Sequence, residues 1–290
     1  MSFIKLDNDA ASLYNGDCIE AMEKLEAGSV DMILCDLPYG TTSLKWDSII
    51  PFDVLWKSYW RVLKPNGAVV LFATTPFTEA LGASQIQYLK YKFTWMKPGV
   101  TGVLNASKMP LKNTEDILVF YRSLPTYNPQ NLQPFGKKVK NSKSRLNENF
   151  AEESAIISGG FNKAEYEQKH TGHPRSVLFS ESYSEKNIKN FEQEAYNDIC
   201  VGENGSLIMS SVERKKEGNL HPTQKPIDLL LYLIKTYTNE GETVLDNTMG
   251  SGSTGVAALL SGRKFVGIEK DPKYFEICVN RINGATEVKK

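Results

Sequence analysis

The chain has little cysteine, little histidine and no excess of either charge. Its 290 residues include 4 cysteines and 3 histidines, and 34 basic residues balance 34 acidic ones. The cysteines are far apart and lack metal-binding spacing, and His170 and His173 have no convincing co-ligands. We therefore expect no metal site, and thiols suited to a reducing cytoplasm. The cysteines are Cys18, Cys35, Cys200 and Cys278.

Long apolar runs are also missing. No stretch could span a membrane, and the N-terminus does not resemble a signal peptide, so we expect a cytoplasmic protein without membrane contact. A net charge of zero excludes a globally basic protein. If the chain binds nucleic acid, the attraction must come from a local patch.

The most informative segment that is present is Asp36-Leu37-Pro38-Tyr39. It ends an apolar run, 30–35, that is typical of a buried parallel strand. A carboxylate, a backbone carbonyl held by proline and an aromatic ring together suit the binding of a planar amino-bearing ring. Ligands of open α/β sheets bind at this edge. A simple turn that ends the strand is the alternative.

A glycine loop stands near the other end of the chain. Gly250, Gly252 and Gly255 form G-x-G-x-x-G between an apolar strand and a helical run, and the next strand, 264–268, ends at Glu269. Glycines permit close approach of a ligand to the backbone, and an acid at the second strand tip can accept hydrogen bonds from ribose hydroxyls. A glycine-rich turn without a ligand is the alternative.

The order of these motifs predicts the fold. The glycine loop follows residue 240 and has one strand and one helix behind it, so the other strands must come from the N-terminal part. We expect an α/β protein with a permuted, doubly wound, Rossmann-like sheet that is mixed and mostly parallel. Antiparallel strands at 91–95 and 116–121 would form one edge.

The motifs together resemble the β-group of amino-directed DNA methyltransferases, which use S-adenosylmethionine. The likeness rests on Asp36 to Tyr39, then His221-Pro222-Thr223-Gln224-Lys225-Pro226, then the loop at Asp246 to Gly255. It covers roughly residues 12–122 and 219–283. Leu37 departs from the usual proline, and Asn247-Thr248-Met249 departs from a common Pro-Phe pair.

This resemblance implies three parts and their roles. Residues 1–122 form the catalytic half, 123–218 an inserted target-recognition region, and 219–290 the cofactor-binding half. Asp36, Pro38 and Tyr39 would be catalytic. The cofactor residues would be Asp17, Cys18, His221, Thr223, Lys225, Asp246, Gly250, Ser251, Gly252, Ser253, Thr254 and Glu269.

Two of these cofactor assignments have a local alternative. Asp17 would accept a hydrogen bond from the cofactor's adenine, or cap the helix that follows, or both. Thr223 and Lys225 lie near a predicted helix N-terminus, which attracts anions, and we expect them to hold the cofactor's methionine carboxylate. A plain helix-entry turn is the alternative for the second pair.

The middle of the chain differs in character. Between 123 and 218 apolar periodicity fades, and a basic run carries nearby aromatic residues. Such a run suits contact with DNA phosphates, and a solvated insert is the alternative. The predicted contacts are Lys137, Lys138, Lys140, Lys143 and Arg145.

Adenine N6 of a flipped base in double-stranded DNA is the target that the Asp-led motif favours within the family. Cytosine N4 is the nearest alternative. An RNA or protein amide or amine methyltransferase, and a catalytically silent nucleic-acid-binding homologue, are further ones. The resemblance also suggests a homodimer and a cognate restriction nuclease as partners.

Overall fold

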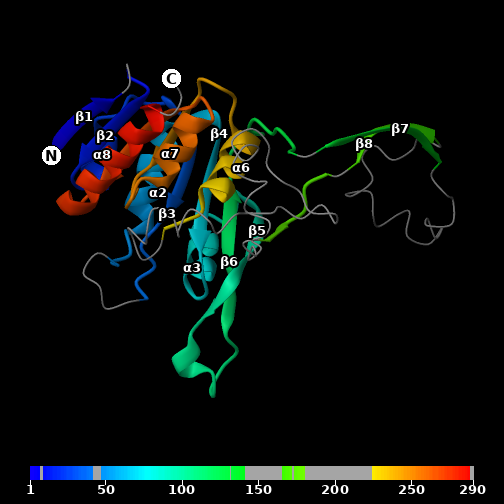
Figure 1. The fold of residues 1–290 in the computed structure, drawn as a ribbon, viewed down its shortest axis with the longest axis horizontal. Coiled ribbons are helices and arrows are strands. Elements are labelled where there is room, and N and C mark those ends of the chain that lie inside the picture. Colours follow the sequence, from blue (N-terminus) through cyan, green and yellow to red (C-terminus); the bar gives the residue numbers. More distant parts are fainter. Residues whose placement is uncertain are drawn as a thin grey trace. The chain divides into compact units, whose positions relative to one another are not determined.

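A mixed sheet of nine strands forms the centre of the main unit in the computed structural model (Figure 1). The structure describes residues 1–6, 9–41, 47–130, 132–140, 165–171, 173–179 and 224–287. The chain divides into two compact units, Met1–Gln130 with Arg175–Lys290, and Asn131–Pro174. None of the helices in these described ranges is long and apolar enough to cross a membrane.

The sheet of the main unit has the order β1-β2-β11-β10-β3-β4-β6-β5-β9. Strands β2, β11, β10, β3 and β4 run parallel, and β6 and β5 add an antiparallel edge. This arrangement confirms the predicted mixed, mostly parallel sheet. The strands are β1 (Ser2–Leu6), β2 (Ala11–Asn15), β3 (Val30–Asp36), β4 (Leu63–Ala73), β5 (Leu89–Thr101), β6 (Lys112–Phe120), β9 (Val177–Phe179), β10 (Thr243–Asp246) and β11 (Lys264–Glu269).

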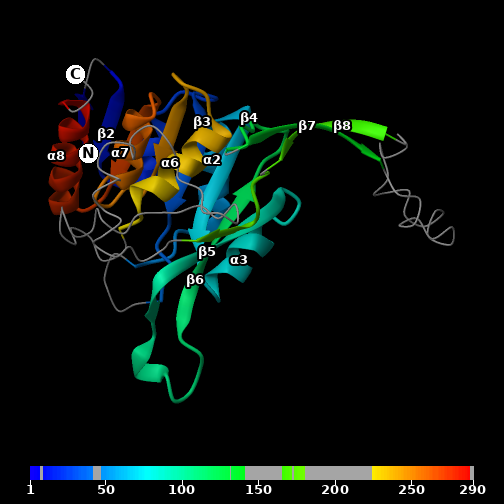
Figure 2. The same cartoon turned by 45° about the vertical axis from the view of Figure 1, so that its right-hand side comes forward.

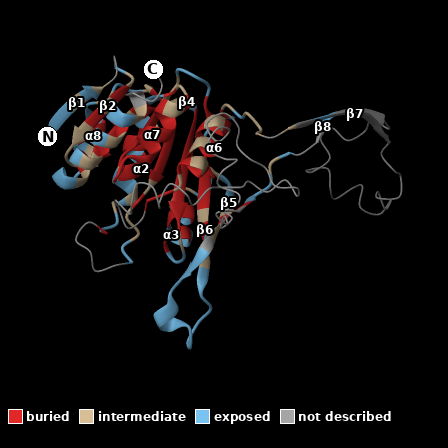
Figure 3. Cartoon of the chain, in the orientation of Figure 1, coloured by how far each residue is buried: buried red, intermediate tan, exposed pale blue. Residues whose placement is uncertain are grey.

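Helices cover both faces of this sheet. Along β3, Met32 and Leu34 pack in the core under α6–α8, whereas Ile33 and Cys35 pack in the core under α1–α3. Both faces of the central strands are therefore buried (Figure 3), which explains their unbroken apolar runs. The helices are α1 (Cys18–Glu23), α2 (Phe52–Val62), α3 (Phe77–Ser84), α6 (Ile227–Tyr237), α7 (Ser253–Leu260) and α8 (Pro272–Glu287).

Three local predictions differ from the structure. The residue types of Lys64-Pro65-Asn66-Gly67 predict a turn. The segment instead lies inside β4 as an irregularity, because the β3–β4 register passes from Val30–Leu63 to Met32–Ala68. The sequence predicts a helix around 77–89, but α3 ends at Ser84, since Gln85 already has non-helical backbone angles. Pro226 is predicted as the first helical residue before 227–237, but it occupies the N-cap position of α6, which begins at Ile227.

Strands β5 and β6 form a long hairpin that extends beyond the sheet (Figure 2). A short 3-10 helix, η1 (Val103–Asn105), forms part of its tip. The tip carries exposed apolar side chains, of which Leu104 is 98% exposed. Because Asp116 of β6 pairs with Ala73 at the end of β4, the hairpin continues past the carboxyl end of β4.

The second unit contains an antiparallel pair, β7 (Gln133–Lys140) and β8 (Glu165–Thr171). Its limits are narrower than the predicted insert of 123–218. The difference arises partly because β9, at Val177–Phe179, pairs with β5 in the main sheet.

Candidate active site

The candidate site lies where the sheet changes its winding direction. From β10 the chain passes through α7 to β11 on one side, and from β3 it passes through α2 to β4 on the other. Strands β10 and β3 are parallel neighbours, so Asp246 and Asp36 end at the same edge. A crevice at such a point is where open α/β sheets bind ligands.

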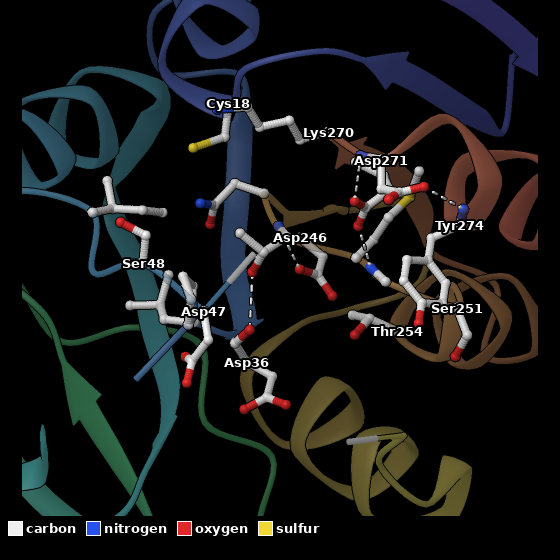
Figure 4. Close-up of a pocket in the computed structure, with 18 of the residues that line it drawn as sticks. Cys18, Asp36, Asp47, Ser48, Asp246, Ser251, Thr254, Lys270, Asp271 and Tyr274 are labelled. Carbon is white, nitrogen blue, oxygen red and sulfur yellow. Dashed lines mark hydrogen bonds between the residues drawn. The ribbon is translucent and has the colours of Figure 1, made fainter. Parts of the chain in front are cut away.

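A pocket of about 680 Å³ occupies this edge (Figure 4). Its size falls in the range of small-molecule and cofactor sites. It joins the two motifs that the sequence separates by some 200 residues. Of the predicted site residues, it is lined by Asp17, Cys18, Asp36, Pro38, Tyr39, Lys225, Asp246, Gly250, Ser251, Ser253, Thr254 and Glu269.

The glycine loop is held to the tip of β11. The backbone N–H of Gly250 donates to Glu269 Oε2 at 2.9 Å, and that of Asp271 donates to Oε1 at 2.8 Å. Burial raises the pKa of Glu269, and these N–H groups oppose the rise. Each carboxylate oxygen keeps lone pairs for a further donor, which suits a pair of vicinal hydroxyls.

Gly252 contributes through packing. It does not line the pocket, its φ is +81°, and a Cβ there would lie 2.7 Å from Cys278 Cβ on α8. A glycine at this position therefore allows α8 to pack closely against the loop.

Asp246 is almost fully buried at the tip of β10. Burial raises its pKa to about 6, although bonds from the Thr254 hydroxyl and the Thr248 N–H work in the opposite direction. The Thr248 hydroxyl donates to the Asp36 carbonyl at 2.9 Å. Thr248, which belongs to the Asn-Thr-Met segment that departs from the family pattern, thus connects the loop after β10 to the end of β3.

Asp17 caps helix α1, because its Oδ1 accepts from the Ile19 N–H at 3.0 Å. It also lines the pocket with Cys18, the first residue of α1. The capping role and the predicted adenine contact are therefore compatible, and the adenine contact stays a prediction.

Asp36 lies in a network of charged groups. Its Oδ2 is 2.5 Å from Lys225 Nζ, and its Oδ1 accepts from the Tyr39 hydroxyl at 2.7 Å. Burial raises the pKa of Asp36, Lys225 lowers it, and the charge of Glu115 raises it further. Since the Asp36 side chain is 20% exposed, it remains accessible from the pocket.

Lys225 pairs with carboxylates of the chain itself. Its ammonium also lies 3.2 Å from Glu115 Oε1 and 5.0 Å from the Phe72 ring centroid. Burial alone would lower the pKa of Lys225, but Asp36 and Glu115 raise it above its ordinary value. In the structure the Lys225 ammonium faces Asp36. Its contact with the carboxylate of the cofactor's methionine part stays a prediction.

The sequence patterns did not point to Glu115 on β6. It is buried, and its Oε1 accepts from the Tyr39 hydroxyl at 2.9 Å. The available signal was the acidic pair Glu115-Asp116 directly before the apolar run Ile117 to Phe120. The residues that such an acid contacts depend on how distant strands pair, and a single sequence does not reveal that pairing.

Some predicted site residues lie outside the described residues, and others lie on the strand pair of the second unit. His221, Thr223, Lys143 and Arg145 are outside the described residues. Lys137, Lys138 and Lys140 are on β7, and the register places Glu167 opposite Lys138 and Glu165 opposite Lys140. The backbone register thus pairs two positions of the basic run with acidic positions of β8.

No group of three or more His, Cys, Asp or Glu within the described ranges could hold a metal ion.

Comparisons with known proteins agree with this architecture. The chain is 26% identical over 97% of its length to the DNA adenine methyltransferase YhdJ of Escherichia coli K12, of which it covers 86%. It is also 26% identical over 97% to the type II methyltransferase M2.LlaDCHI of Lactococcus lactis subsp. cremoris, of which it covers 92%.

Solved structures share the fold. The M1.HpyAVI–SAM complex matches with a TM-score of 0.54 and 22% identity, covering 94% of this chain and 99% of that one. The cytosine-N4-specific PvuII DNA methyltransferase matches with a TM-score of 0.59 and 17% identity, covering 99% and 95%. The DNA methylase family of the N6/N4 type matches residues 30–280. The chain therefore belongs to the N6/N4 DNA methylases, enzymes that transfer a methyl group from S-adenosylmethionine to DNA.

Proposed function

We propose that this enzyme methylates the N6 amino group of adenine in duplex DNA, after the base has been flipped into the pocket. The observation that carries the proposal is the position of Asp36, which lies at the end of β3 in the same pocket as the glycine loop and Glu269. The adenine specificity named for YhdJ supports the choice of base.

The pocket fits S-adenosylmethionine. The Glu269 carboxylate suits the two ribose hydroxyls, and Ile19, Met249, Pro272 and Tyr274 provide apolar and aromatic walls for an adenine ring. At the other end, Asp246 and its neighbours supply the polar groups that an amino-acid tail needs. When bound, the cofactor supplies an electrophilic methyl group.

Asp36 and Pro38 would act on the target nitrogen. The lone pair of an aromatic amine is delocalised into its ring, which makes the nitrogen a poor nucleophile. By accepting the two amino hydrogens, the Asp36 carboxylate and the Pro38 carbonyl favour a pyramidal nitrogen with a localised lone pair, and they orient it. The negative charge of Asp36 also stabilises the positive charge that develops on that nitrogen.

Flipping the base costs a few kcal/mol. Stacking on Tyr39 would return about 1–3 kcal/mol, by analogy with other base–aromatic contacts. In the structure the Tyr39 ring packs against the Phe77 ring, with the two ring centroids 5.1 Å apart, and this contact helps to orient the Tyr39 ring.

The β5–β6 hairpin offers a DNA-facing surface besides the predicted basic run. It continues past the strand ends that carry the site. Its tip carries exposed apolar residues, such as Leu104, and also the exposed basic residues Lys108 and Lys112. Proteins that bend or open DNA combine apolar side chains with basic ones in this way. A homodimer, a cognate nuclease and a cytoplasmic location stay predictions.

The decisive experiment identifies the methylated nucleoside. Protein is incubated with labelled S-adenosylmethionine and duplex DNA, the DNA is digested, and the nucleosides are separated. N6-methyladenine supports the proposal, N4-methylcytosine replaces it by the alternative, and no transfer to DNA overturns it. The Asp36→Ala variant should lose transfer while it still binds the cofactor.

A further inference from the structure

Asp36 does not face the pocket alone. It belongs to a buried group of five side chains, here called the Asp36 cluster: Asp36, Tyr39, Lys97, Glu115 and Lys225. Two carboxylates and two ammonium groups balance each other in it. Three separate strands, β3, β5 and β6, supply Asp36, Lys97 and Glu115, whereas Tyr39 comes from the segment after β3 and Lys225 from the segment before α6.

Glu115 stands at the centre of this cluster. Its Oε1 lies 3.2 Å from Lys225 Nζ and accepts from the Tyr39 hydroxyl at 2.9 Å, while its Oε2 lies 3.5 Å from Lys97 Nζ. It contacts both groups that also contact Asp36. Glu115 itself is not among the residues that line the pocket, and its side chain is 8% exposed.

The two contacts on Asp36 conflict with its proposed task. One carboxylate oxygen faces the Lys225 ammonium at 2.5 Å and the other accepts from Tyr39 at 2.7 Å. An arriving amino group needs one of these oxygens. If Lys225 simply moved away, a buried ammonium would lose its partner, which is strongly unfavourable.

Glu115 resolves the conflict because it is a second acceptor for the same two donors. The Tyr39 hydroxyl has one proton for two acceptors, and the Lys225 ammonium already lies between two carboxylates. We propose that Glu115 is a positioning residue that takes over Lys225 and the Tyr39 hydroxyl when the target amino group bonds to Asp36. The proposal rests on the proposed amino methyl transfer and assigns it one more residue.

Charge decides how the Glu115→Gln variant should behave. Glutamine still offers an oxygen, but it removes one negative charge, so Lys225 is left with Asp36 as its carboxylate partner in the cluster. Asp36 then becomes a poorer acceptor. We expect kcat to fall about 10- to 100-fold, the effect of weakening one hydrogen bond to a charged group. Cofactor affinity should change much less than kcat, because Glu115 lies outside the pocket lining.

The pH dependence gives a readout that a structural role would not move. Asp36 must be ionised to accept, so activity falls as pH drops through its pKa. The groups that act on Asp36 are Lys225 and Tyr39, together with Glu115 on β6 and Asp246 at the tip of β10. The charge of Glu115 raises the pKa of Asp36. Its loss should therefore move the acid limb of the kcat profile to lower pH.

Removal of the opposite charge should reverse this shift. Lys97 pairs with Glu115 from β5, and its side chain is 25% exposed. In Lys97→Met the cluster keeps both carboxylates and loses one cation, so the acid limb should move to higher pH. This second variant keeps the inference testable if Glu115→Gln folds poorly.

The matched control is Asp116→Asn, on the next residue of the same strand. Asp116 pairs with Lys92 at 3.0 Å and accepts from the Thr78 hydroxyl at 3.0 Å, away from the Asp36 cluster. We expect this variant to keep kcat and the acid limb of wild type.

The experiment measures kcat, KM and cofactor affinity from pH 5 to pH 9 for wild type and the three variants, with duplex DNA as substrate. Opposite shifts of the acid limb in Glu115→Gln and Lys97→Met support the inference. Wild-type kcat and an unmoved limb in Glu115→Gln would overturn it. Absence of methyl transfer by the wild-type enzyme would instead count against the proposed function.

Discussion

At the scale of single residues, two buried carboxylates at neighbouring strand tips have different partners. Asp36 faces the Lys225 ammonium, whereas Asp246 is bonded by hydroxyl and backbone N–H donors without a cation in the described contacts. Burial therefore raises the pKa of Asp246 to about 6, compared with its ordinary 3.8. Ionisation of Asp246 is therefore costly in the folded protein.

Asp246 should make stability depend on pH in an unusual direction. Its folded pKa is above its unfolded pKa, so the native state holds more protons between about pH 4 and pH 6. The contribution of this group thus falls as pH rises through that window and stays constant above it. The loss is on the order of 3 kcal/mol by linkage.

The Asp246→Asn variant should lack this component. Urea unfolding at several pH values checks it: the wild-type free energy of unfolding minus that of the variant should decrease between pH 4 and pH 6 and then become level. A difference that does not change with pH would contradict the burial argument.

At the scale of elements, the glycine loop and α8 fit together because residue 252 has no side chain. Gly252→Ala introduces two costs, a left-handed backbone angle and a Cβ that meets Cys278. Strain in this region costs about 1–2 kcal/mol and overpacking about 1–3 kcal/mol. We expect the variant to lose stability by the sum and to bind the cofactor more weakly.

Gly241→Ala is the matched control for that experiment. Gly241 has the same φ of +81°, but a Cβ added there would meet open space, with no atom beyond its chain neighbours within 4 Å. It should show the backbone cost alone. Equal losses in the two variants, measured by thermal unfolding, would show that the contact with α8 adds nothing.

Helix α2 is joined to the loop after β10 by one buried hydrogen bond. The Tyr59 hydroxyl donates to Asn247 Oδ1 at 2.5 Å. In Tyr59→Phe the amide oxygen loses this donor, at a cost of about 1–3 kcal/mol. We expect a lower midpoint in urea unfolding, and an unchanged midpoint would show that water or another donor replaces the hydroxyl.

At the scale of the whole molecule, the second unit can be removed cleanly. The chain enters and leaves its strand pair at neighbouring positions, because Gln133, the first residue of β7, pairs with Thr171, the last residue of β8. A short Gly/Ser linker in place of 134–170 should leave the main unit folded, with cofactor affinity near wild type. If β7 makes the predicted phosphate contacts, DNA affinity should fall and its dependence on salt should weaken when they are lost.

Isothermal titration with S-adenosylmethionine and DNA binding at two salt concentrations test that deletion. The full-length charge-reversal variant Lys138→Glu provides the comparison without a change in chain length. If the shortened protein kept both the affinity for DNA and its salt dependence, the DNA contacts would belong to the main unit, where the β5–β6 hairpin is the exposed basic and apolar element.

Local patterns in the sequence were sufficient for the elements that bear the motifs. The apolar run that ends in Asp36 and the strand that ends in Glu269 were both predicted, because burial on both faces of a parallel sheet leaves continuous apolar segments. The motif order also predicted the mixed sheet. The β-bulge-like irregularity at 64–67 was mistaken for a turn, since turn residues serve both.

By itself, therefore, the sequence determined which residues would end the strands and line one pocket, because those features depend on local periodicity and motif order. Tertiary structure alone decided what surrounds Asp36. Glu115 and Lys225 are 110 positions apart, and they meet because β6 pairs with β4 in one register while the segment before α6 approaches β3. A one-residue change of that register would place Glu115 on the other face of the sheet. Pairing between distant strands, which no local pattern records, thus completes the site.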